Sequence, residues 1–346
     1  MRQAATILGL TLLGVMFSVA CGASCNGGSC GTPSGTPSGT PIGIQGDTRY
    51  GSSLSRGEGD PSPRYLAALA YDVAHDDYVL FGGQTRTGTS GETWILRRTG
   101  SSAKRPAQWT QAKPQHNPSP RRDAAMAWDP IGHVVLMYGG LVPDHAEGFE
   151  ASDTWAWNGS DWKQVADEAG PGARDGARMV TAGGRVLLFG GHVANIKYFA
   201  DMWSWDGARW VAVDARPTPP ARGDTAMVWT PQSSSVIIFG GRGAKPDAGP
   251  GNSGTPLQDA WRFKDGTWSE LPAGPPSIGL PTASAHGTID WIMSGVTCPA
   301  DKAVAWKWDG QSWRDVGPTN YLWGAATAAG PDGTAVQFGG SSEPAC

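Results

Sequence analysis

A short apolar run that ends in a glycine pair, or in a near copy of one, recurs six times along this chain of 346 residues. The runs are 78–83, 134–140, 186–191, 236–241, 289–295 and 336–340. The second glycines of successive runs are 57, 51, 50, 54 and 45 residues apart. A recurrence near fifty residues indicates one structural unit repeated in a single domain, and it constrains the architecture more than any other feature of the chain.

Each glycine run is flanked by two further motifs. Upstream lies an apolar segment that usually opens with an arginine, and downstream a loop leads to an Asp-x-Trp-x-Trp motif or a variant of it. An Asn-Gly or Asp-Gly pair and one more tryptophan then follow in four of the copies. These dipeptides favour type I′ hairpin turns, and Trp-x-Trp places two large rings on one face of a strand. Each unit is therefore predicted to be a sheet of four antiparallel strands.

Composition agrees with this prediction. The chain has 50 glycines and 27 prolines, and only 17% of its residues are charged, which suits many short strands joined by tight turns. The predicted first strands carry small residues, which fit the crowded inner edge of a ring of sheets, whereas the tryptophans fill the widening gap between neighbouring sheets. The small residues are Ala67, Ala125, Ala177, Ala226 and Ala325.

The combination of these motifs resembles the kelch β-propeller family over about residues 62–340. The resemblance implies an all-β fold, a six-bladed kelch-type β-propeller. Some members of that family are copper galactose oxidases or sialic acid epimerases. The copper oxidases need a Tyr–Cys crosslink with His and Tyr ligands, and no tyrosine–histidine cluster accompanies Cys298 or Cys346 here, so that activity is not carried over.

Closure of the ring requires a contribution from the N-terminal region. The C-terminal copy stops at its second strand, which would leave an open sheet edge. Ile42, Ile44 and Tyr50 repeat almost the spacing of the tryptophans in a complete copy. We therefore predict that 41–54 supplies the outer strands of the sixth blade. The alternative is a five-bladed ring with a loose hairpin.

The N-terminus reads as an export signal over residues 1–20, with one charge and a short apolar core. Residues 18–21 resemble a bacterial lipobox, which implies lipidation of Cys21; the alternative is ordinary cleavage in the same stretch. Residues 21–40 are rich in Gly, Ser, Thr and Pro and predict an extended tether before a propeller at 41–346. We expect a lipid-anchored protein of the bacterial outer membrane, or alternatively a soluble periplasmic or secreted one.

The other four cysteines predict disulfides, because an exported protein enters an oxidising compartment. Cys25 and Cys30 would close a small loop in the tether. Cys298 and Cys346 each follow a glycine run in neighbouring copies, so a bridge between them would fix the C-terminus.

The net charge of −4 gives no reason to expect nucleic acid as a partner. We expect a monomer that meets the membrane only through its N-terminal lipid. The six histidines contain no His-x-His or His-x-x-x-His pair, so the sequence predicts neither a metal site nor a cofactor.

Candidate ligand-binding residues lie where the first strands begin. We predict an arc of cations near the channel mouth, with His192 and Tyr321 beside it; the arginines are Arg64, Arg121, Arg174 and Arg222. Such an arc could hold a carboxylate. The alternative is that each arginine binds loop carbonyls or the acid next to it. Those acids are Asp123, Asp175 and Asp224.

Loops between the second and third strands are further site candidates, because they vary on a repeated scaffold. They are 84–91, 141–152, 192–200, 242–258 and 296–303. Acids of the second loop could bind calcium, but the loop lacks the Asp/Gly periodicity of a defined calcium loop, so a plain solvated acidic loop is favoured. We expect a non-catalytic module that binds a protein or glycan at this loop face. The alternative is an epimerase-like or mutarotase-like enzyme acting on acidic sugars at the channel mouth.

Overall fold

The computed structural model of the chain describes residues 6–8, 59–97, 108–143, 149–166, 170–243, 254–272, 282–286, 289–293, 304–308, 311–318, 324–330 and 335–340. All regular structure in these residues is β-strand, which confirms the all-β prediction. Within the same residues, no helix is long and apolar enough to cross a membrane.

The described residues form five four-stranded antiparallel sheets. Each sheet is one copy of the sequence unit, in the strand order that the motifs predict. The first is β3 (Ala68–Asp72), β4 (Asp77–Phe81), β7 (Thr93–Arg97) and β8 (Gln108–Gln111), and the second is β9 (Ala125–Asp129), β10 (Val134–Tyr138), β13 (Thr154–Trp157) and β14 (Trp162–Ala166). The third is β15 (Arg178–Ala182), β16 (Arg185–Phe189), β19 (Met202–Trp205) and β20 (Trp210–Val213). The fourth is β22 (Ala226–Thr230), β23 (Ser235–Phe239), β26 (Ala260–Lys264) and β27 (Thr267–Glu270), and the fifth is β28 (Thr282–His286), β29 (Ile289–Met293), β30 (Val304–Trp308) and β31 (Trp313–Pro318).

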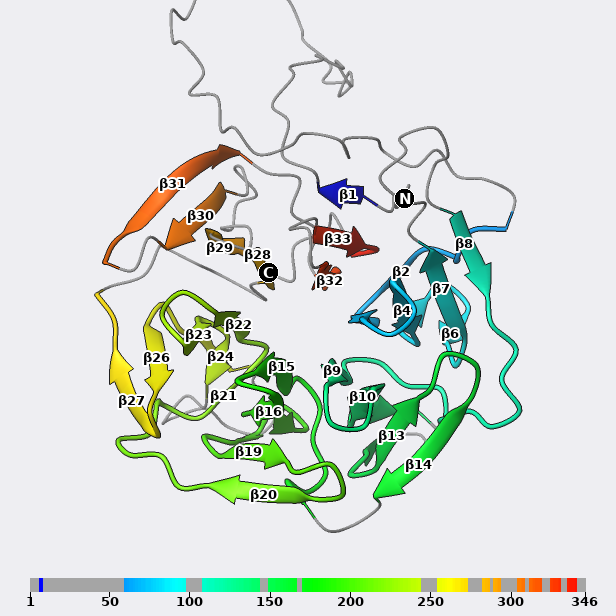
Figure 1. Cartoon of the computed structure of the whole chain (residues 1–346), viewed down its shortest axis with the longest axis horizontal. Helices are drawn as coiled ribbons and strands as arrows, with labels where there is room; N and C mark the ends of the chain where they lie inside the picture. Colours follow the sequence, from blue (N-terminus) through cyan, green and yellow to red (C-terminus); the bar gives the residue numbers. More distant parts are fainter. Residues whose placement is uncertain are drawn as a thin grey trace, which may run out of the picture.

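The first strands of the sheets lie closest to a common central axis (Figure 1). Strands β3, β9, β15, β22, β28 and β32 (Ala326–Ala329) contact one another in that cyclic order, and β32 contacts β3. The later strands of each sheet step outward to the rim, so the sheets are arranged as blades around an axis.

The sheet that contains β32 has three strands, with β33 (Ala335–Phe338) in the middle and β1 (Thr6–Leu8) outside it. β1 runs antiparallel to β33, with Ile7 opposite Val336. The partner of β33 therefore comes from the segment predicted to be an export signal, whereas the predicted segment 41–54 lies outside the described residues. Pairing with β1 satisfies backbone groups along an edge that would otherwise be open. The count of six complete blades stays a prediction, as does the five-bladed alternative.

Aromatic packing joins each blade to the next. An aromatic residue near the end of the second strand meets the final tryptophan of the following blade, edge-on or tilted, at a favourable distance. The ring centroids are 5.5 Å apart in Phe81–Trp162, 5.5 Å in Tyr138–Trp210, 5.3 Å in Phe189–Trp268 and 5.6 Å in Phe239–Trp313. Phe338 and Trp109 make the same contact at 5.1 Å, so the last sheet packs against the first.

Short hairpins extend the blades beyond the glycine pairs. They form between the segment that opens the first strand and the loop that follows the second strand. They comprise β2 (Arg64–Tyr65) with β5 (Gln84–Thr85) and β6 (Gly88–Thr89); β11 (Leu141–Val142) with β12 (Phe149–Glu150); β17 (His192–Val193) with β18 (Lys197–Tyr198); and β21 (Arg222–Gly223) with β24 (Arg242–Gly243) and β25 (Thr255–Pro256). We call them the loop hairpins.

Candidate functional site

The four repeat arginines lie inside the blades. Each is at most 2% exposed: Arg64, Arg121, Arg174 and Arg222. The Arg121 guanidinium donates to the two carboxylate oxygens of Asp153 at 2.5 and 2.9 Å and to the Gly139 carbonyl at 3.0 Å. The other three make equivalent contacts, Arg64 with Glu92 and Gly82, Arg174 with Asp201 and Gly190, and Arg222 with Asp259 and Gly240. We call each such set an arginine clamp.

The clamps contradict the prediction of an arc of accessible cations at the channel mouth. The four guanidiniums are buried and fully engaged, so they present no charge at the channel mouth. The alternative was right that the arginines bind carbonyls, but the acids that it named are wrong, because the paired acids belong to the Asp-x-Trp motif or its Glu-x-Trp variant. Burial acts to raise the pKa of Asp153, but Arg121 and the Trp155 indole N–H outweigh it and hold that pKa below its ordinary value.

The glycine pairs contact the backbone carbonyls of the clamp arginines in the next blade. Gly139 has φ +65°, and a Cβ there would lie 2.5 Å from the carbonyl oxygen of Arg174 in the next blade. The following residue, Gly140, donates its N–H to that same carbonyl at 2.9 Å. Only glycine combines this conformation with so close an approach. The feature that repeats most clearly in the sequence therefore fixes each blade to its neighbour.

Four backbone hydrogen bonds among the described residues link successive blades along one opening of the channel. Two residues after each arginine the chain has positive φ, at Leu66, Asp123, Gly176 and Asp224. The N–H of each donates to the carbonyl of the equivalent residue in the preceding blade; the distances are 2.7 Å from Leu66 to Gly324, 2.8 Å from Asp123 to Leu66, 3.2 Å from Gly176 to Asp123 and 2.8 Å from Asp224 to Gly176. These hydrogen bonds bring residues of different blades, far apart in sequence, to one channel mouth.

A cavity of about 120 Å³ lies within the channel. Small side chains line it, as the alanine pattern of the first strands predicts; they include Ala67, Ala125, Ala226 and Ala325. The third blade departs from this pattern, because Arg178 lines the cavity there, together with Asp123 of the second blade. The wall thus combines small and apolar side chains with Thr225, Thr327 and this charged part of the mouth.

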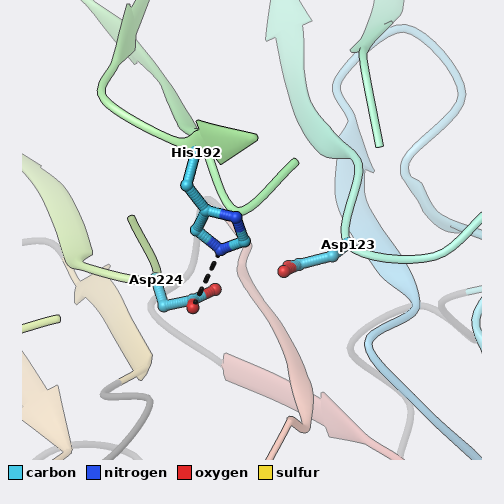
Figure 2. Close-up of side chains that lie close together, drawn as sticks. All are labelled: Asp123, His192 and Asp224. Atoms are coloured by element: carbon cyan, nitrogen blue, oxygen red, sulfur yellow. Dashed lines mark hydrogen bonds and ion pairs between the residues drawn. The ribbon is translucent and has the colours of Figure 1, made fainter. Parts of the chain in front are cut away.

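Five charged side chains gather at the mouth, from the second, third and fourth blades. Figure 2 shows the carboxylates of Asp123 and Asp224 converging on the imidazole of His192. His192 Nε2 lies 3.4 Å from Asp224 Oδ2, and the Arg178 guanidinium lies 3.2 Å from Asp123 Oδ1 and 3.4 Å from Asp224 Oδ1. His192 Nδ1 lies 2.7 Å from Asp175 Oδ1, the distance of an ion pair, although the angle is too bent for a hydrogen bond. We call these five residues the channel-mouth cluster.

The cluster perturbs the acid–base behaviour of its members. Burial alone would lower the pKa of His192, but the Asp175 and Asp224 carboxylates outweigh it and raise that pKa to about 10. Burial, reinforced by the charge of Asp224, raises the pKa of Asp123 to about 7. Burial also acts to raise the pKa of Asp224, but His192 and Arg178 hold it below its ordinary value. Perturbed groups of this kind in a cavity mark a candidate functional site.

Two glycines make room for the histidine ring. A Cβ on Gly223 would lie 2.3 Å from His192 Cδ2, and one on Gly176 would lie 2.8 Å from His192 Nε2. Other blades carry Tyr65, Arg122 or Asp175 at the position of Gly223. Gly223 and His192 therefore both differ from the residues at the equivalent positions of the other blades, and the glycine leaves room for the histidine ring.

The loop hairpins of the second and third blades contact each other at the outer part of the same face. Glu150 accepts a hydrogen bond at 2.6 Å from the backbone N–H of Ala194. Near this contact, Phe149 is 46% exposed and Ile196 is 58% exposed. Two large apolar side chains of adjacent hairpins are thus presented to solvent.

The remaining predicted site residues have different outcomes. His192 lies at the channel mouth, as expected, but it is 3% exposed and held by carboxylates. Tyr321, the disulfides Cys25–Cys30 and Cys298–Cys346, and the lipidation site Cys21 lie outside the described residues. So do 144–148, the middle of the acidic loop for which calcium binding was considered.

Sequence reasoning missed the assembly of the cluster. Asp123, Asp175 and Asp224 were noticed only as neighbours of arginines, and Arg178 was not singled out. Aligning the copies gives a usable signal, since Arg178 replaces a first-strand alanine and His192 aligns with Gln84, Leu141 and Arg242 after the glycine pairs.

Residues 101–289 match the family described as the KLHDC2/KLHL20/DRC7 Kelch-repeats domain. The chain belongs to the kelch-repeat family. The match covers the blades that supply the clamps of Arg121, Arg174 and Arg222 and the whole channel-mouth cluster. Together with the ring of antiparallel sheets, it confirms the prediction of a kelch β-propeller. Kelch repeats are commonly protein-interaction modules, a use consistent with non-catalytic binding.

The chemistry open to the cluster follows from its donor atoms. Among the described residues, His192, Asp123 and Asp224 each offer a ligand atom, and these atoms lie within 4.8 Å of one another. The cluster can therefore hold protons or a cation between its carboxylates, whereas its negative groups oppose an anionic ligand.

Proposed function

We propose that this kelch propeller is an exported, non-catalytic binding module that holds a protein or glycan partner on its loop hairpins. One observation carries the proposal. The repeated residues are engaged in the clamps and the interblade contacts, while two hairpins that contact each other through Glu150 and Ala194 each expose one large apolar side chain, Phe149 and Ile196. Exposed apolar side chains on a rigid scaffold are typical of partner-binding surfaces.

The N-terminal features extend this proposal to location. A lipid on Cys21 and a tether over residues 21–40 would hold the propeller away from the bacterial outer membrane. Cleavage before Cys21 would remove β1, so in the mature protein another strand, such as the one predicted within 41–54, would have to pair with β33. The membrane would then be met only through the lipid, and the propeller would act as a monomer. The net charge of −4 favours no nucleic-acid role.

The alternative of an enzyme acting on acidic sugars depended on exposed arginines. The four described repeat arginines are occupied by Glu92, Asp153, Asp201 and Asp259, so no observation favours that alternative.

Site-specific photo-crosslinking in cells tests the binding face. A photoreactive amino acid at Ile196 should give a defined adduct with one partner. The same amino acid at Val73, which is 54% exposed on the turn at the opposite end of the first blade, is the matched control and should give none. Adducts from Val73 alone, or equal adducts from both positions, would place the binding surface elsewhere.

A second measurement ties the adduct to binding. Ile196→Asp combined with Phe149→Asp should reduce co-purification of the crosslinked partner at least about tenfold, because a charge replaces each apolar contact. Val73→Asp should leave it unchanged. If a soluble glycan abolishes the Ile196 adduct, the partner is bound through its glycan.

A further inference from the structure

We propose that His192, Asp123 and Asp224 form a binding site for a divalent first-row transition-metal ion, with zinc as the ion that fits best. The site would lie at the channel mouth, at the meeting point of three blades. The proposal does not rest on partner binding at the loop hairpins, although His192 itself lies on one of them, in β17.

The orientation of His192 supports a metal ligand. Asp175 Oδ1 lies 2.7 Å from Nδ1 in an ion-pair contact, and its negative charge favours the proton of a neutral ring on that nitrogen even without a well-aligned hydrogen bond. Nε2 then carries the lone pair and faces Asp224. A histidine ligand oriented by a carboxylate on its other nitrogen is the usual arrangement around zinc. Zinc would displace the proton that Nε2 holds in the metal-free protein.

The distance between the ligand atoms of His192 and Asp224 agrees with the distance between two ligands of a tetrahedral zinc ion. His192 Nε2 and Asp224 Oδ2 are 3.4 Å apart. A charge-assisted hydrogen bond would be about 2.7–2.9 Å long. Two ligands on a tetrahedral zinc, each about 2.0–2.1 Å from the metal, are about 3.3–3.4 Å apart. Asp123 offers the third oxygen within 4.8 Å of the other two atoms, so a small rotation of its carboxylate would close the set.

The lack of a side chain at Gly176 keeps the surroundings of His192 Nε2 and Asp224 clear of a methyl group. A Cβ on Gly176 would be 2.8 Å from His192 Nε2 and 2.9 Å from Asp224 Oδ1. The absence of a side chain there leaves a cradle next to two of the three ligands. The channel cavity of about 120 Å³ adjoins Asp123 and could supply water as a fourth ligand.

The charges also balance. With a neutral His192, the three carboxylates of Asp123, Asp175 and Asp224 and the guanidinium of Arg178 sum to −2. A divalent cation neutralises this set. Arg178 contacts the Oδ1 atoms of Asp123 and Asp224, which leaves their Oδ2 atoms for the ion.

The donor set selects the class of metal. One imidazole nitrogen and two carboxylate oxygens suit zinc or manganese, whereas calcium prefers oxygen ligands alone. We therefore expect zinc to bind more tightly than manganese, and calcium to bind weakly.

Equilibrium dialysis of the chelator-treated full chain tests the site. We expect about one zinc ion per chain, with Asp123→Asn and Asp224→Asn each weakening binding at least about 100-fold and Asp175→Asn about 10- to 100-fold. His116→Gln is the matched control, because His116 and Asp161 form a similar pair on the exposed surface, with Nδ1 2.7 Å from Oδ2. It should leave zinc affinity unchanged.

Cobalt substitution provides a readout that does not depend on variants. Co²⁺ in a four-coordinate site of nitrogen and oxygen ligands should give visible d–d absorption that zinc abolishes by displacement. The absence of zinc, manganese and cobalt binding to the wild-type chain would overturn the proposal. So would one bound ion per chain whose affinity is the same in folded Asp123→Asn and Asp224→Asn chains.

Discussion

Arg174 and Asp175 are neighbours in the chain, yet their side chains enter different ion networks. Arg174 forms a clamp with Asp201 inside the third blade, whereas Asp175 contacts His192 at the channel mouth. The clamp recurs in four described copies and pairs each cation with one acid. The channel-mouth cluster occurs once, combines three acids with two basic groups, and depends on residues that break the repeat. The repeated arginine clamps therefore stabilise the blades, whereas the charged residues that gather once, at the channel mouth, mark the candidate site.

Removing a clamp arginine should have the largest effect on stability. Arg121→Met leaves the Asp153 carboxylate buried without its cation and should lower the free energy of unfolding by about 3–5 kcal/mol. Arg122→Met is the control in the next position, because Arg122 is half-buried and, among the described residues, its side chain donates a hydrogen bond to Gln84, worth about 1 kcal/mol. Urea denaturation measures both. Equal losses would show that the clamp contributes no more than an ordinary hydrogen bond.

A substitution in a glycine pair tests the backbone contact between neighbouring blades. Gly139→Ala places a methyl group against the Arg174 carbonyl at positive φ, and should cost about 3 kcal/mol. Gly183→Ala is the control, since Gly183 also has positive φ but no atom lies within 4 Å of its Cβ position. It should cost about 1 kcal/mol, from backbone strain alone. Similar urea midpoints for the two variants would contradict the assigned role of the interblade contact.

Asp77 is a buried acid that lacks a clamp. Its Oδ1 has no hydrogen-bond partner among the described residues, and burial, reinforced by Asp72, raises its pKa to about 6; Asp76 also raises it, whereas His75 and Arg97 lower it. The folded state then binds the proton more tightly than the unfolded state. The contribution of this carboxyl to stability is therefore greatest below about pH 4 and is lost as the pH rises through 6.

Asp77→Asn should consequently raise the free energy of unfolding at pH 7.5 by about 2 kcal/mol and change it little at pH 4. Thermal melting across this pH range measures the effect. A parallel pH dependence in the variant and the wild type would mean that the buried Asp77 carboxyl is stabilised as fully as the clamped acids are.

The sequence alone was sufficient for the sheets, their strand order and the ring, because glycine pairs, hairpin turns and tryptophans recur about every fifty residues. The alternative for the arginines named the next acid in the chain, Asp123 for Arg121, whereas the acid that Arg121 binds is Asp153, which the sheet brings close to it. Only the paired strands decide between them. The cluster was missed for a similar reason, since His192 and Asp123 are 69 residues apart and meet only when the ring closes.

Asp123→Asn should have the smallest effect on stability, and in the opposite direction to the clamp variants. The metal-free cluster holds three acids against Arg178 and His192, so removing one negative charge should raise the free energy of unfolding by about 1 kcal/mol at pH 8. Asp153→Asn is the matched control and should lower it, because Arg121 then loses its carboxylate partner. Urea denaturation in chelator compares the two. A loss of stability in both variants would show that the channel-mouth cluster, like the clamps, stabilises the fold. A gain confined to Asp123→Asn would show that this carboxylate destabilises the fold, as expected of a residue that belongs to a functional site.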